Sequence, residues 1–292
     1  MRFIVPVLAV VILFGPKAIA QNQFIELKLL SYSQLYNTNG ARFDLSGNVQ
    51  VGEQFYINAD GKDDSFIYEI KLINQKWHIV NKSPLHLDGD LDLEAVDYCN
   101  GLFYLANEEN GKVYTYPLSG KSQELPIDFG TETPGDWGNA GWEGLAIDCQ
   151  GNVLYLVKER QPRKVFKVNL ATKGIEDTFN IPETESNDFA DAKFEKGFLY
   201  LLERNGNFVT KVNPETHEVI QKVSYRQTCS HENGKLYAPS KYGMAESLLL
   251  TEDEIWIGLD NNGIPASDYA TKKYGMIGDA PVILRFKRPT GF

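Results

Sequence analysis

Acidic side chains recur at one position of an internal sequence repeat. Each of them begins a short apolar segment: Glu94, Glu143, Asp188 and Glu246. Ser46 holds the same place in a more degenerate first copy, and the five positions are separated by 48, 49, 45 and 58 residues. Recurring carboxylates can bind a hard cation, exchange protons or activate water. They are therefore the first residues to consider for chemistry.

A second polar set ends the strand that follows each apolar segment. It comprises Asn58 with Asp60, Glu108 with Glu109, Glu159 with Arg160, Glu203 with Arg204, and Asp260 with Asn261. In antiparallel strands, the start of the first and the end of the second lie on the same face. Such surroundings are rich in oxygen and poor in His, which favours Ca²⁺ over zinc. We expect the metal ligands to be Glu94, Glu143, Asp188, Glu246 and Asn261.

Two alternatives accompany this expectation. The acids of both sets can instead cap their strands, accept hydrogen bonds from loop N–H groups and face water. In the fourth copy, an equally good alignment places Asp191 rather than Asp188 at the recurring position.

The repeat also predicts the elements that position these residues. Segments 93–118, 142–170 and 188–213 each contain an apolar strand, a polar turn, an aromatic-rich alternating strand and a third strand. Fourth strands are expected at 77–85, 122–129, 174–181 and 218–226. A period near 50 residues with several short strands is typical of a β-propeller blade. We predict an all-β propeller with five blades, or six if residues 227–245 contain another.

Closure of the ring is expected to use both ends of the chain. The last unit has only three strands, of which residues 282–288 form the third. Residues 24–30 are expected to supply its missing outer strand. Helical periodicity over ten or more residues is absent, which argues against an α/β fold, and a β-sandwich would not give a period near 50.

The first 20 residues are typical of a secretory signal peptide. Arg2 precedes an apolar stretch at 3–14, and Ala18-Ile19-Ala20 forms a small-x-small cleavage site. This stretch is shorter than the roughly 20 residues that a membrane-spanning helix needs. We expect cleavage after Ala20, no transmembrane segment, and one secreted or periplasmic propeller domain at 21–292. The net charge of −10, without a Lys/Arg-rich run, argues against nucleic-acid binding, and we expect a monomer.

Two long loops lead into the acidic face, at 131–142 and 227–244. Their candidate ligand-binding residues are Asp136, Trp137, Trp142, Tyr237, Lys241 and Tyr242. Exposed aromatic rings beside polar groups suit a small molecule or a glycan, and long loops on a rigid scaffold are where binding concentrates. The alternative is a lid that only seals the ring.

The three cysteines cannot all pair within one chain. Cys99 and Cys149 occupy similar places in the repeat, so they are the first pair to test for a disulfide, with Cys229 left over. The alternative is that all three are free.

Three segments resemble a known family of secreted propellers. They are NAGWEGLAIDCQGNVLYLVKER, NDFADAKFEKGFLYLLER and MAESLLLTEDEIWIGLDNN. The chain resembles the propellers grouped as "esterase-like activity of phytase" and is similar to the SdiA-regulated (YjiK-type) propellers. This resemblance implies a secreted or periplasmic propeller with Ca²⁺ near its axis. It places Glu143, Glu246, Arg204 and Asn261 on the family's recurrent polar positions, whereas Ser46, Ala95 and Ala190-Asp191 depart from its pattern.

Three functions remain open from the sequence. The first is a metal-dependent hydrolase of an ester or phosphate ester, with Glu143, His231 and Arg204 as the candidate catalytic residues. The second is a non-catalytic propeller that binds a carbohydrate, peptide or envelope component, and the third is a ring that Ca²⁺ merely stabilises. No G-x-S-x-G motif is present, which gives a Ser-dependent esterase no support.

Overall fold

The computed structural model describes residues 24–37, 43–61, 64–87, 89, 91–205, 207–231, 234–236, 245–260 and 262–292. The expected signal peptide lies outside these residues. Within them, helix is confined to the short elements η1 (Pro134–Asp136), α1 (Arg226–Cys229) and α2 (Asp268–Tyr274). None of these helices is long and apolar enough to cross a membrane.

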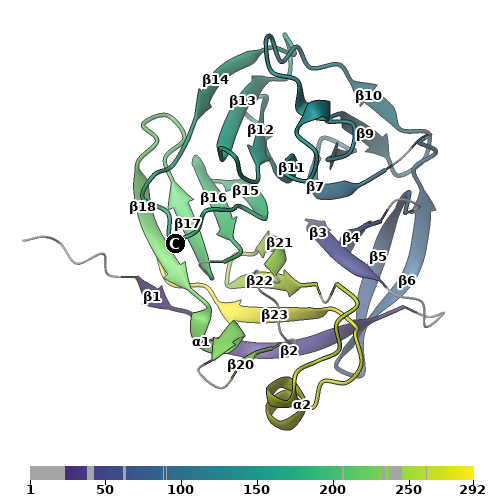
Figure 1. Cartoon of the computed structure of the whole chain (residues 1–292). Helices are drawn as coiled ribbons and strands as arrows, with labels where there is room; N and C mark the ends of the chain where they lie inside the picture. The colour runs from purple at the N-terminus through teal and green to yellow at the C-terminus, as the bar shows by residue number, and fades with distance from the viewer. Residues whose placement is uncertain are drawn as a thin grey trace, which may run out of the picture.

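The β-strands form sheets that radiate around a central axis (Figure 1). The first is β3 (Asp44–Val51), β4 (Gln54–Asp60), β5 (Phe66–Ile73) and β6 (Lys76–Pro84). The second is β7 (Leu93–Cys99), β8 (Leu102–Asn107), β9 (Val113–Pro117) and β10 (Gln123–Leu125). The third is β11 (Trp142–Asp148), β12 (Val153–Lys158), β13 (Lys164–Asn169) and β14 (Ile175–Phe179).

The remaining sheets involve both ends of the described chain. The fourth is β15 (Asp191–Glu195), β16 (Phe198–Glu203), β17 (Phe208–Val212) and β18 (Val219–Ser224), with β1 (Ile25–Glu26) at its edge. The last is β21 (Ala245–Leu250), β22 (Glu254–Leu259), β23 (Val282–Lys287) and β2 (Leu29–Tyr36). The end of β2 also pairs in parallel with β6, which makes the last and first sheets continuous. A two-stranded ribbon, β19 (Ser230–His231) and β20 (Gly234–Lys235), lies between these sheets in sequence.

The innermost strands pack against one another in a closed circle. Strand β3 contacts β7, β7 contacts β11, β11 contacts β15, β15 contacts β21, and β21 returns to β3. The hydrophobic core lies between neighbouring sheets, as in the cluster of Trp142, Phe166 and Tyr104 between the second and third sheets. Alternating apolar residues on both faces of each sheet produce this arrangement, since each sheet must bury two faces.

The sequence located the outer strands well, with one displacement. Strands β10, β14 and β18 lie within the expected segments, and β6 begins one residue before its segment. The N-terminal strand does pair with β23, but through residues 29–34 rather than 24–30. The reason is Leu27, which is buried in the core between the fourth and last sheets, so that the chain crosses from β18 to β23 at this residue.

A disulfide joins the second sheet to the third. Cys99 ends β7 and Cys149 directly follows β11, and their Cα atoms are 5.8 Å apart. The pair that the repeat pointed to is therefore bonded. Cys229 ends α1, and its side chain lies outside the described residues.

Candidate functional site

Four innermost strands carry a β-bulge at the recurring polar position. The pairing register skips one residue between Leu45 and Gly47, Leu93 and Ala95, Trp142 and Gly144, and Ala245 and Ser247. The skipped residues are Ser46, Glu94, Glu143 and Glu246. A bulge redirects a side chain and ends regular pairing, and bulges are common beside active sites. The same local distortion thus presents all four residues at one mouth of the central channel.

Strand register also identifies the equivalent residue of the fourth sheet. In the other four sheets, an aromatic residue of the second strand pairs with the residue that lies three positions after the recurring polar residue. In the third sheet, for example, Tyr155 pairs with Ala146, three positions after Glu143. In the fourth sheet Tyr200 pairs with Lys193, which makes Ala190 the equivalent residue. Neither Asp188 nor Asp191 occupies this position, so the expectation of Asp188 as a member of the ring was wrong.

A second ring of residues follows from the same register. Counting four residues beyond each aromatic residue gives Asp60, Glu108, Glu159, Arg204 and Asp260. The fourth sheet is again different, because it supplies a cation where the others supply a carboxylate. The fourth sheet therefore contributes Ala190 and Arg204 to the two rings and no acid.

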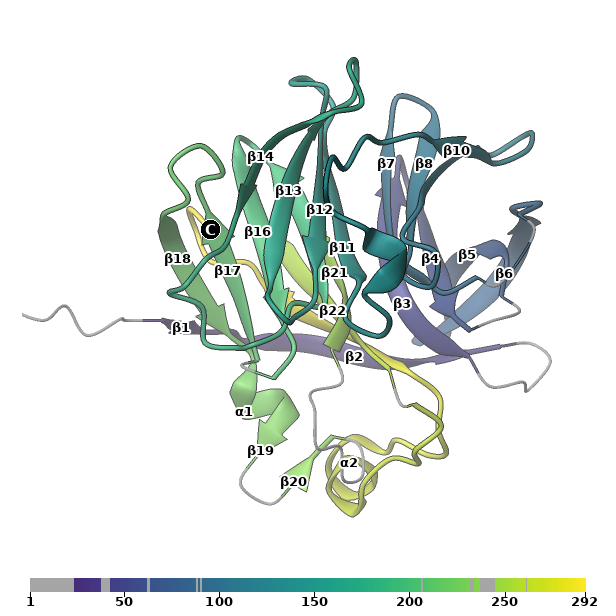
Figure 2. The same ribbon diagram turned by 45° about the horizontal axis from the view of Figure 1, so that its top comes forward.

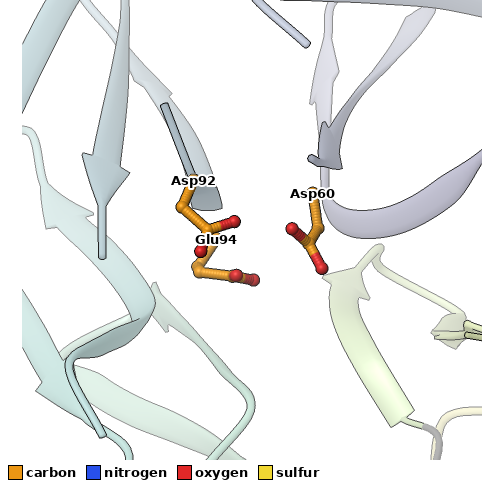
Figure 3. Close-up of side chains that lie close together, drawn as sticks. All are labelled: Asp60, Asp92 and Glu94. Atoms are coloured by element: carbon orange, nitrogen blue, oxygen red, sulfur yellow. The ribbon is translucent and has the colours of Figure 1, made fainter. Parts of the chain in front are cut away.

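Three carboxylates form the first cluster at the mouth. Asp60 at the end of β4 faces Asp92 and Glu94 of the neighbouring sheet (Figure 3). Each offers an oxygen, and these oxygens lie within 4.8 Å of one another. The hydroxyl of Ser46 donates a 2.6 Å hydrogen bond to Glu94 Oε2. No described Lys, Arg or His side chain forms an ion pair with these three acids.

Burial and mutual repulsion raise the pKa values in the first cluster. Burial, assisted by the neighbouring Asp60, raises the pKa of Asp92 to about 8. Burial, with the charges of Glu143, Asp60 and Asp92, raises the pKa of Glu94 well above its ordinary value. Carboxylates perturbed in this way favour either a proton or a cation between them.

The second cluster contains Glu108, Glu143 and Glu159, whose oxygens also lie within 4.8 Å of one another. Here a guanidinium sits among the acids. Arg204 Nη2 lies 2.8 Å from Glu143 Oε2, and its Nη1 lies 3.1 Å from Glu159 Oε1. The same Nη2 contacts Glu246, and Arg160 contacts the other oxygen of Glu159.

The charges of the second cluster are strongly coupled. Burial opposes the charged form of Arg204, but Glu143, Glu246 and Glu159 raise its pKa above the ordinary value. Burial raises the pKa of Glu246 to about 8, although Arg204 acts in the opposite direction. Burial also raises the pKa of Glu108 to about 7, against the hydrogen bond from the Gly141 N–H. Glu108 can therefore exchange a proton near neutral pH.

The loop at 131–142 adjoins this mouth, but its aromatic residues mostly serve the core. Trp142 is fully buried and donates through Nε1 to the Gly111 carbonyl at 2.9 Å. It is therefore a core residue, which corrects the expectation that it is exposed for a ligand. Trp137 is half-buried against Trp142, with ring centroids 4.9 Å apart. Asp136 is exposed, and Gly141 N–H donates to Glu108 Oε1 at 2.8 Å.

The other expected site residues lie apart or outside the described chain. Asp188 is buried, and it accepts hydrogen bonds from Ser186 and from Asn205, which fixes the turn after β16. The side chain of His231 is outside the described residues, as are Tyr237, Lys241, Tyr242 and Asn261. By connectivity, α1, the ribbon and α2 belong to the face of the mouth, and they project together from one side of the sheets (Figure 2).

Sequence reasoning missed Asp92 and a network deeper in the channel. Asp92 lies two residues before Glu94, and this alternation could have placed both on one side of an extended chain. Below the mouth, Lys193 Nζ reaches from β15 to the Val96 carbonyl at 3.0 Å and to Asp191 at 3.3 Å. Because β11 lies between β7 and β15 in the circle, Lys193 crosses the channel.

The buried Asp191 and the half-buried Asp97 extend this network to further strands. Asp191 Oδ2 accepts a 2.7 Å hydrogen bond from the Leu248 N–H of β21. Asp97 Oδ2 accepts a 3.0 Å hydrogen bond from the Ile147 N–H of β11. Burial raises the pKa of Asp191 to about 7, although Lys193 acts to lower it. One lysine and two carboxylates thus connect four innermost strands.

Three solved structures resemble this chain, and one of them superposes with a TM-score above 0.5. Glutaminyl cyclase of Myxococcus xanthus superposes with a TM-score of 0.58 at 11% identity, covering 91% of this chain and 100% of that one. Virginiamycin B lyase of Staphylococcus aureus gives 0.44 at 12% identity, covering 83% and 66%. Luciferin-regenerating enzyme gives 0.49 at 10% identity, covering 86% and 80%. The likeness to the glutaminyl cyclase confirms the expected all-β propeller, and an identity of 11% shows the fold alone.

A family comparison gives the relationship that the sequence motifs suggested. The SdiA-regulated family model matches residues 66–231, which is more than half of the chain. The match includes the second and third sheets, strands β5 and β6 of the first, and β15–β18 of the fourth. The matched region contains Asp92, Glu94, Glu108, Glu143, Glu159 and Arg204. The chain belongs to the SdiA-regulated family.

Proposed function

We propose that this chain is a secreted or periplasmic five-bladed propeller that binds Ca²⁺ at its acidic channel mouth. The ligands are Asp60, Asp92 and Glu94. One observation carries the proposal: their oxygens converge within 4.8 Å, with no described cationic side chain to balance them. Buried carboxylates that crowd together are costly unless a cation or protons neutralise them.

The donor set suits a hard cation. All three ligands are carboxylates, and Ca²⁺ accepts carboxylate oxygens in flexible geometry, whereas zinc prefers His and Cys. Asp60 belongs to the first sheet, and Asp92 and Glu94 belong to the second. A cation held between them therefore links two neighbouring sheets at the axis.

The blade number is supported by the strand circle. The innermost strands β3, β7, β11, β15 and β21 contact one another in order and return to the start. Each is followed by strands of its own sheet, and β2 completes the last sheet. The ribbon β19–β20 is too short to form a sixth blade.

We further propose that the mouth hydrolyses an ester or phosphate ester. A bound Ca²⁺ supplies a Lewis acid that polarises a carbonyl or phosphoryl oxygen. Glu108 is the best-placed proton acceptor, because burial brings its pKa to about 7. Glu143 and Arg204 are paired with each other, so they hold the geometry of the mouth rather than exchange protons.

A second candidate function is non-catalytic binding of a glycan at the same face. Half-buried Trp137, with Lys158 Nζ 5.0 Å from its ring, offers an aromatic surface in the loop beside the mouth. In this function any cation serves only the structure. The two candidates differ in whether turnover accompanies binding.

Thermal-shift measurements on residues 21–292, followed by turnover assays, test the proposal. We expect Ca²⁺ to raise the melting temperature and EDTA to reverse the increase. Asp92→Asn should abolish the response, whereas Asp253→Asn, at an exposed position in the turn between β21 and β22 on the opposite side of the sheets, should keep it. Assays of p-nitrophenyl phosphate and p-nitrophenyl acetate with Ca²⁺ then separate the two candidates. A wild-type melting temperature that does not change with Ca²⁺ would contradict the proposed cation site.

A further inference from the structure

We propose that Arg204 is a built-in cation that fills the second carboxylate cluster, so that the mouth takes one exchangeable divalent cation instead of two. The inference deepens the proposed function and rests on Ca²⁺ binding at the first cluster. It assigns to Arg204 the role of setting the metal stoichiometry, rather than that of a catalytic residue.

The two clusters both consist of three carboxylates, but only the second has guanidinium groups in contact with them. Each provides three carboxylates whose oxygens lie within 4.8 Å of one another. In the first, the polar contact is the neutral hydroxyl of Ser46 on Glu94. In the second, Arg204 contacts both Glu143 and Glu159. Arg204 is the guanidinium that joins two carboxylates of the second cluster, whereas Arg160 contacts only the other oxygen of Glu159.

The position of Arg204 in the repeat explains why it can reach these acids. It occupies the ring position where the other sheets carry Asp60, Glu108, Glu159 and Asp260. The fourth sheet also carries Ala190 at the inner position, where Glu94, Glu143 and Glu246 stand in others. The sheet that lacks both acids is therefore the one that contributes the cation.

The guanidinium contacts carboxylates from two other sheets. Glu143 and Glu159 come from the third sheet, and Glu246 comes from the last. The Arg204 side chain is 13% exposed, and Glu159 is fully buried. In such a site the attraction between a guanidinium and carboxylates is weakly screened, and a divalent cation entering beside it would be repelled. One oxygen each of Glu143, Glu159 and Glu246 already accepts a hydrogen bond from Arg204.

Isothermal titration of Ca²⁺ into metal-free protein tests this assignment. We expect one equivalent for the wild type, two for Arg204→Gln, and one for Arg204→Lys, which keeps a positive charge. The double variant Arg204→Gln/Glu143→Gln should return to one equivalent. Circular dichroism checks that each variant is folded. If Arg204→Gln folds only with Ca²⁺, its melting temperature is measured against Ca²⁺ concentration instead. A steeper increase than that of the wild type then supports the assignment.

The outcomes separate this inference from the proposed function. If the wild type binds no Ca²⁺ and Arg204→Gln binds one equivalent, the first cluster is not a site, and the assignment of Arg204 stands. If Arg204→Gln binds the same number of equivalents as the wild type, the assignment is overturned. Two equivalents in the wild type would also overturn it, because Arg204 would then not exclude the second cation.

Discussion

Replacing Lys193 with Met should destabilise the propeller strongly. Lys193 is almost fully buried and spans the channel from β15 to the Val96 carbonyl of β7. It is also the cation paired with Asp191, whose side chain is fully buried. The substitution keeps much of the side-chain volume, so the change isolates the charge rather than creating a large cavity.

The expected magnitude follows from the burial of both partners. Breaking a buried ion pair by removing one member costs about 3–5 kcal/mol when the remaining group stays charged, so the measurement is made at about pH 9, above the pKa of about 7 of Asp191. For a domain of this size, about 1 kcal/mol lowers the melting temperature by roughly 2–4 °C. We therefore expect Lys193→Met to lower it by roughly 6–20 °C.

Urea unfolding and differential scanning calorimetry measure this loss. Lys196→Met is the matched control, because Lys196 lies on the same β15–β16 hairpin with 73% of its side chain exposed. It should change the unfolding free energy by less than about 0.5 kcal/mol. The double variant Lys193→Met/Asp191→Asn should lose less than Lys193→Met alone, because it no longer buries an unpaired charge.

A loss below about 1 kcal/mol for Lys193→Met would refute the reasoning. It would mean that water or protonation of Asp191 compensates for the missing cation, and that the network does not hold the innermost strands together. Equal losses for Lys193→Met and the double variant would also contradict it.

Four further predictions concern the disulfide, the mouth and the channel. Cys99→Ser/Cys149→Ser should lower the unfolding free energy by about 2–4 kcal/mol in urea titrations, because the bond closes a long loop. Ca²⁺ affinity measured by calorimetry should rise from pH 6 to pH 8, because the pKa of Asp92 is raised to about 8 and a ligand must lose its proton to bind metal. Glu108→Gln should reduce any Ca²⁺-dependent hydrolysis about 10²–10⁴-fold without changing Ca²⁺ binding. Folding raises the pKa of Asp191 to about 7, so between about pH 4 and pH 7 the folded state holds a proton that the unfolded state releases. The free energy of unfolding should therefore fall as the pH rises through this range. Asp191→Asn should flatten this slope, which urea unfolding at several pH values measures.

The sequence predicted the repeat because each unit carries its own strands and turns. Glu94, Glu143 and Glu246 stand at one phase of that repeat, and the bulges place them at one mouth. Local pattern was sufficient here, since strand alternation and turn residues fix the register within a sheet. It was also sufficient to find the Cys99–Cys149 disulfide, whose members hold similar places in adjacent units.

Contacts across the channel could not be predicted in the same way. Arg204 belongs to one sheet but contacts Glu143 and Glu246 of two others, and Lys193 reaches the backbone of β7. No sequence period encodes which side chain crosses the axis. The equivalent residue of the fourth sheet was not predicted either, because Ala190 is apolar and lies between Asp188 and Asp191.

The most direct test is a crystal structure of residues 21–292 grown with Ca²⁺. We expect anomalous density for one ion between Asp60, Asp92 and Glu94, with calcium–oxygen distances of about 2.3–2.6 Å. Arg204 should remain between Glu143 and Glu159, without an ion beside it. A mouth free of bound metal at saturating Ca²⁺, or an ion bound elsewhere in the channel, would contradict the central claim.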